Sequence, residues 1–124
     1  MSSVLFQQYL QAADDAMRMK HYVEAACMFR MARVSANSEE EILCTLHGLA
    51  EACAQNKEFE KSETALRDAA AIERARFGVA SKEHLQVIRR LAKLMAKAQA
   101  HQASSAYLKK KEQDTPRPKR SKLG

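Results

Sequence analysis

Tryptophan is absent from this 124-residue sequence, and the residues that form turns are scarce, with three glycines and two prolines. Aromatic residues make up only 6%, whereas hydrophobic residues make up 46% and are mostly strong helix formers. This balance predicts an all-α protein. The apolar runs are too short to cross a bilayer, and no secretory signal opens the sequence.

The three cysteines, Cys27, Cys44 and Cys53, are an odd number and have no spacing typical of a disulfide framework. They therefore predict free thiols in a reducing compartment, and we expect a cytoplasmic protein. Each cysteine falls on an apolar or small position of a helical pattern. We expect all three to be small core residues.

Catalytic and metal-binding patterns have little support in the sequence. No glycine-rich phosphate loop is present, and no Ser/His/Asp or Cys/His group suggests a nucleophile. Cys44 and His47 share one helical face, but a structural zinc needs four ligands and no second pair is suitably spaced. His21 and His101 are expected in turns between helices. We predict that the protein is not an enzyme and has no cofactor and no metal.

The formal net charge of +6 is concentrated at the end of the chain. From Lys109 onward there are seven basic and two acidic residues, whereas residues 1–108 hold 14 basic and 13 acidic ones. The stretch 114–122 contains both prolines and almost no apolar residue, so we expect a disordered basic tail over 113–124.

Apolar stripes and capping residues place the helices. We expect helices over 3–18, 22–34 and 59–76, a third helix that starts at Ser38, and a fifth capped by Ser81. A sixth, alanine-rich helix is expected over 101–112. The stripe that faces the neighbouring helices is then predicted to contain the small residues Ala13, Ala50 and Ala92 at the closest approaches. For the fifth helix the predicted stripe is Leu85, Ile88, Leu91, Ala92 and Met95.

One pattern occurs twice and weakens on a third pass. Tyr22 and Phe59 are each followed at +3 by a small residue, at +7 by a large apolar one and at +10 by alanine. His101 starts the degraded third copy, in which Ser104, Leu108 and Lys111 keep the spacing. The copies are 37 and 42 residues apart, and repeats of this length are typical of stacked helical hairpins.

These positions resemble the tetratricopeptide repeat family. The first copy matches at Tyr9, Ala12, Ala13, Ala16, Tyr22, Ala25, Phe29 and Ala32. The second copy matches at Leu46, Leu49, Ala50, Cys53, Phe59, Ser62, Leu66 and Ala69, and the third at Leu91, Ala92, Met95, His101, Ser104 and Leu108. The longer spacing, between the second and third copies, is similar to that of kinesin-light-chain repeats. The resemblance implies a short right-handed superhelix of about three antiparallel hairpins over 3–112.

The resemblance also implies a non-catalytic function. In this family the first helix of each hairpin lines a concave groove that holds a peptide or helix of a partner, so an adaptor, scaffold or co-chaperone-like role is expected. The predicted groove residues are Leu10, Asp14, Met17, Arg18, His47, Glu51, Gln55, Arg89, Lys93 and Lys97. The three cations Arg89, Lys93 and Lys97 favour an acidic partner.

Two other functions remain open. A nucleic-acid- or ribosome-associated protein would use the basic fifth helix and phosphate contacts of the tail, from Lys109, Lys110, Lys111, Lys119, Arg120 and Lys122. Self-association could occur through the last helix, where Tyr107 and Leu108 are predicted to be exposed.

Overall fold

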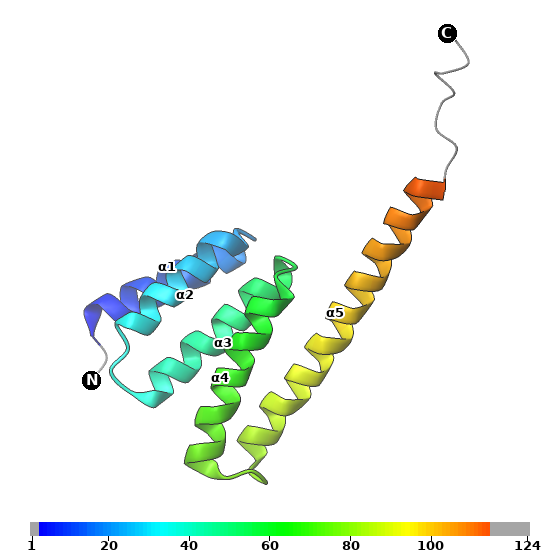
Figure 1. Cartoon of the computed structure of the whole chain (residues 1–124). Helices are drawn as coiled ribbons and strands as arrows, with labels where there is room; N and C mark the ends of the chain where they lie inside the picture. Colours follow the sequence, from blue (N-terminus) through cyan, green and yellow to red (C-terminus); the bar gives the residue numbers. More distant parts are fainter. Residues whose placement is uncertain (1–2, 115–124) are drawn as a thin grey trace.

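The computed structural model describes residues 3–114, with side chains up to Lys109, and this part of the chain is all-α. Successive helices lie side by side along the array (Figure 1). Its five helices are α1 (Val4–Arg18), α2 (Tyr22–Val34), α3 (Glu39–Gln55), α4 (Phe59–Phe77) and α5 (Lys82–Asp114). The prediction of an all-α protein is confirmed.

Serine side chains cap three of the helices, and two of these caps, Ser38 and Ser81, are predicted by the sequence. Ser3 Oγ accepts a hydrogen bond from the Phe6 amide, 3.0 Å, and Ser38 Oγ accepts one from the Glu41 amide, 3.2 Å. Ser81 Oγ accepts from the amide of His84 at the start of α5, 3.2 Å. Each bond satisfies one of the amides that a helix leaves unpaired at its first turn.

The turns α1–α2 and α3–α4 have the same backbone form. Lys20 and Lys57 adopt left-handed φ angles of 62° and 63°. In the first turn the His21 amide donates to the Ala16 carbonyl, 2.8 Å, and in the second the Glu58 amide donates to the Cys53 carbonyl, 2.8 Å. These are the bonds of a Schellman motif, so each pair of helices is closed by the same reversal.

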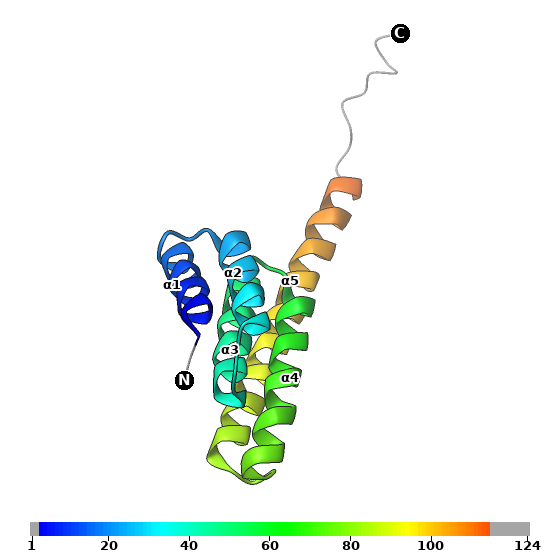
Figure 2. The same ribbon diagram turned by 90° about the vertical axis from the view of Figure 1, so that its left-hand side faces the viewer.

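The third pair is different, because α5 runs without interruption through the expected turn and there is no separate helix over 101–112. Residues 96–100 contain three alanines and no glycine or proline, and such residues favour a continuing helix. The prediction of a third hairpin is therefore wrong. The second half of α5 extends past the other helices (Figures 1 and 2).

The core between α1, α2 and α3 consists mainly of small residues packed with Phe29, whereas the core between α3, α4 and α5 also contains several leucines. Ala13 and Ala50 are buried, as expected of residues on the inner stripe, but Ala92 is exposed. The buried residues of α5 are Val87, Leu91 and Leu94. The predicted stripe of α5 is therefore mostly wrong. The helix packs on the body through Val87, Leu91 and Leu94, and no separate sixth helix covers the predicted face with Leu85, Ile88 and Met95.

The cysteines divide between core and surface. Cys53 is buried, whereas Cys27 and Cys44 are exposed free thiols. The expectation that all three are core residues is wrong for two of them. The predicted tail over 113–124 lies outside the described residues, apart from Gln113 and Asp114, which belong to α5.

Candidate functional site

A groove lies between α3 and α5. Residues of α4, which lies between these two helices in the chain, also contribute to its lining. Two adjoining clefts of about 440 Å³ and 130 Å³ form it, and both are lined by Glu51, Ala54 and Lys97. The smaller cleft has an apolar floor that includes Leu66 of α4 and Leu94 of α5. We call these two clefts the α3–α5 groove.

The two walls of the α3–α5 groove differ in charge. The α5 wall carries Arg90, Lys93 and Lys97. The α3 wall carries Glu51 and Gln55, and Gln55 Nε2 donates a hydrogen bond to Glu51 Oε1, 3.0 Å. Within the described residues neither lysine forms an ion pair, whereas Lys61 and Arg67 on α4 are each paired with a glutamate. Lys93 and Lys97 on the α5 wall therefore have no carboxylate of the described chain at ion-pair distance, although Glu51 lines the same groove.

A polar network adjoins the groove through Arg90, which belongs to both. His47 Nε2 lies 3.5 Å from Glu73 Oε1, and the other ring nitrogen of His47 is hydrogen-bonded to Arg90. Glu73 is buried, and its network joins α3, α4 and α5. Burial, and then the Arg90 charge, lower the pKa of His47, and the bond to Glu73 opposes them. A neutral imidazole is the form that fits this position.

The structure brings together only part of the predicted groove. Glu51, Gln55, Lys93 and Lys97 line the α3–α5 groove. His47 belongs to the polar network behind it. Arg89 is exposed on α5 but is absent from the lining, where Arg90 takes its place.

The four predicted residues of α1 do not line this groove. Leu10 and Met17 are half-buried against the core. Asp14 is exposed, and Arg18 pairs with its neighbour Asp15. Among the predicted tail residues, Lys109 is exposed on α5, and Lys110 and Lys111 belong to the same helix. Lys119, Arg120 and Lys122 lie outside the described residues.

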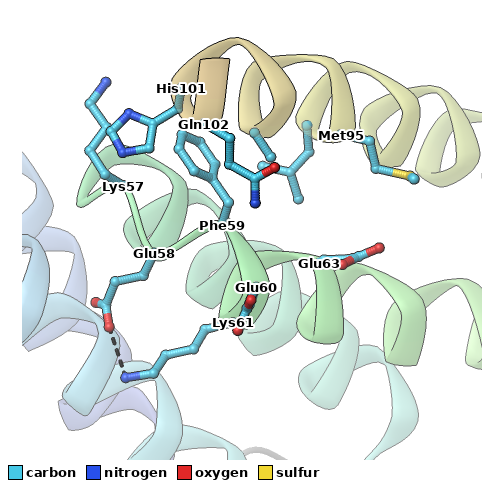
Figure 3. A pocket seen from close by; sticks show the side chains of 11 residues that line it. Lys57, Glu58, Phe59, Glu60, Lys61, Glu63, Met95, His101 and Gln102 are labelled. Atoms are coloured by element: carbon cyan, nitrogen blue, oxygen red, sulfur yellow. Dashed lines mark ion pairs between the residues drawn. The ribbon is translucent and has the colours of Figure 1, made fainter. Parts of the chain in front are cut away.

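Sequence reasoning missed a further cleft, of about 510 Å³, which lies between the start of α4 and the middle of α5 and is separate from the two clefts of the groove (Figure 3). Phe59, Leu94 and Met95 are among its lining residues. The Phe59 ring contacts the His101 ring, with centroids 5.4 Å apart. This cleft exists because α5 continues past the expected turn, so no local sequence signal points to it.

Metal binding gains no support from the geometry. No group of three His, Cys, Asp or Glu side chains within the described residues is arranged to hold a metal ion. Cys44 is exposed, and partial burial together with Asp14 and Glu41 raises the pKa of its thiol. A thiol with a raised pKa is a poor nucleophile at neutral pH.

The chain matched no protein-family model, no curated protein and no solved structure in the comparisons. Over the residues that the structure describes, none of the helices combines the length and the apolar character that a bilayer crossing requires.

Proposed function

We propose that this protein is a non-catalytic adaptor that binds an acidic helix or peptide of another protein in the α3–α5 groove. The observation that carries the proposal is the pair Lys93 and Lys97, one turn apart beside an apolar floor and without ion pairs in the described chain. The floor would bury the apolar face of the ligand. The lysines would pair with its carboxylates and fix its orientation.

We also propose that the array is a short right-handed superhelix of the tetratricopeptide type. The two matching left-handed turns, 37 residues apart at Lys20 and Lys57, support this proposal. The exposed free thiols Cys27 and Cys44 support a reducing location such as the cytoplasm. In this arrangement α1 and α3 are the first helices of the two pairs, α5 follows without a second helix, and the groove lies between α3 and α5.

The test is binding of a labelled helical peptide with glutamates along one face and leucines along the other, followed by fluorescence anisotropy. The variant Lys93→Glu with Lys97→Glu reverses both groove charges. The matched control is Lys82→Glu with Arg89→Glu, which reverses two exposed charges of the same helix outside the groove lining. Each exposed ion pair contributes about 0.2–1 kcal/mol, so reversing two should weaken binding by about tenfold.

The control variant should change the affinity by less than about threefold, because long-range charge effects are screened by salt. Equal losses in both variants would contradict a groove site and indicate binding to the net charge of α5. A twin peptide with glutamine in place of glutamate should bind more weakly to the unmodified protein.

A nucleic-acid-associated function is the second candidate, favoured by the excess of cations on α5. Its probe is a single-stranded oligonucleotide, measured between about 50 and about 200 mM salt, where binding through phosphates falls steeply. Glutamine substitutions at Lys119, Arg120 and Lys122 should weaken oligonucleotide binding if the tail supplies contacts. Oligonucleotide binding that exceeds peptide binding at the higher salt concentration would favour this function over the adaptor.

A further inference from the structure

One face of α5 is apolar and largely exposed in the part of the chain that the structure describes. Leu85, Ile88 and Met95 are 42%, 41% and 41% exposed, about a third of a turn around the helix from the buried Val87, Leu91 and Leu94. Met95 also lines the cleft beside α4. Smaller exposed residues extend the same face. The outer stripe, as we name it, consists of Leu85, Ile88, Ala92, Met95, Gln99 and Ala103, and Ala106 follows one turn later.

The spacing of the outer stripe alternates between three and four residues over its first five members, which is the period of a helix that pairs along its length. From Leu85 to Ala106 it spans about 32 Å at 1.5 Å per residue. All the described side chains from Gln99 to Lys109 are classed as exposed. The second half of α5 therefore gains little stability from packing within the described chain, and a partner surface would stabilise it.

The large residues of the outer stripe lie in its first half and the small ones in its second half. An antiparallel pair of α5 helices, centred between Met95 and Ala96, therefore places large side chains opposite small ones. Leu85 faces Ala106 of the second copy, and Ile88 faces Ala103. In a parallel pair the large residues would instead face one another, and the alanine half would be left with a gap.

The charges of α5 are compatible with this pairing. Lys93, Lys97 and Arg90 lie between about a third and half of a turn around the helix from the outer stripe. Arg89 flanks the stripe, but in the antiparallel pair it lies level with the neutral Gln102 of the second copy. No cation therefore lies within the seam itself.

We infer that the outer stripe is an isologous interface through which two copies of this chain pair antiparallel along α5. A two-fold axis between Met95 and Ala96 uses the same patch on both copies, which closes the assembly as a dimer. The projecting half of each α5 then covers the Leu85–Met95 half of the other. The basic wall of the α3–α5 groove stays open, so the inference does not rest on the proposed binding of an acidic ligand.

The first test is the molar mass of the full chain by sedimentation equilibrium, from about 1 to about 500 µM, since a dimer of this kind dissociates on dilution. The variant Ile88→Glu with Met95→Glu should weaken the dimer by at least tenfold. The matched control, Gln86→Glu with Ser104→Glu, adds the same charge on an exposed face off the stripe and should leave the dimer unchanged. Circular dichroism checks that both variants keep the helical body.

The second test reports the orientation. In a chain with Cys27→Ser and Cys44→Ser, a mixture of Ile88→Cys and Ala103→Cys proteins should form disulfide-linked heterodimers under mild oxidation. Ile88→Cys alone should form no such link, because the two copies of residue 88 are far apart in the antiparallel pair. A monomer over the whole concentration range, a dimer insensitive to the stripe substitutions, or efficient linking of Ile88→Cys alone would overturn the inference.

Discussion

Gly48 should not tolerate a side chain, although it lies within a helix. It sits on α3 where that helix meets α2, and a Cβ atom built on it would overlap the ring of Phe29. Phe29 is only 4% exposed and packs within the cluster that also holds Ala25 and Cys53. The ring has no free space to enter, so Gly48→Ala should destabilise the fold.

The expected magnitude comes from two opposing effects. Replacing glycine by alanine inside a helix gains about 0.5–1 kcal/mol of stability. Overpacking a close-packed core by one methyl group costs about 1–3 kcal/mol. We expect a net loss of roughly 0.5–2 kcal/mol, which corresponds to a fall of roughly 2–8 °C in the unfolding midpoint.

The assay is thermal and urea unfolding of Gly48→Ala, Phe29→Leu and the double variant. Leucine removes the ring that the new methyl group would meet. The stability loss of the double variant should therefore be about 1 kcal/mol smaller than the sum of the losses of the two single variants. A higher midpoint for Gly48→Ala alone would refute the reasoning. It would mean that α2 and α3 can separate at little cost.

Two further changes probe the contacts between α3, α4 and α5. Ser62→Ala removes the buried hydrogen bond from Ser62 Oγ to the Ala50 carbonyl, 2.7 Å, and should cost about 1–2 kcal/mol in urea unfolding; a loss below the measurement error would contradict a structural role for this bond. His47 has a lowered pKa in the folded chain, so the unfolded chain binds more protons below neutral pH. Stability should therefore fall as the pH falls from about 7 to about 5, and His47→Gln should flatten that slope; an unchanged slope would exclude His47 as its cause.

Much of the secondary structure could be predicted because its signals are local. The predicted helices 3–18, 22–34 and 59–76 agree with α1, α2 and α4 to within one residue. Ser38 and Ser81 were identified as caps from residue type alone, and both accept the expected hydrogen bonds. Capping and amphipathic periodicity act within one or two turns of helix, so a single sequence contains them.

The buried face of α5 could not be predicted from such local signals. The helix has two adjacent apolar stripes, one with Val87 and Leu94 and one with Ile88 and Met95, and both have helical periodicity. Only the packing of α4 decides which stripe is buried. The sequence analysis predicts burial of the stripe with Ile88 and Met95, which a separate sixth helix would cover. That helix does not exist as a separate element, because α5 is continuous.

Only part of the groove could be predicted: Glu51, Gln55, Lys93 and Lys97 line it as expected, whereas Arg89 does not and the polar network was not foreseen. The pattern predicts His47 as a groove residue, but His47 is absent from the groove lining and its ring is bonded to Arg90 and Glu73. Glu73 is buried on α4, and a glutamate in a charged helix is normally exposed. Such long-range pairings between distant helices leave no trace in local spacing.

Two positions of the repeat decide whether this chain forms a hairpin or a continuous helix. They are the left-handed turn residue and the aromatic residue two positions later. A lysine in the left-handed region costs about 1–2 kcal/mol, so the turns at Lys20 and Lys57 need compensation. The aromatic residue two positions later can supply it, and Phe59 packs against the core. In the third copy the turn position is Gln99 and the aromatic is replaced by His101, which is exposed. Without that burial the left-handed turn is not compensated, the helix continues, and the apolar face of α5 is left uncovered.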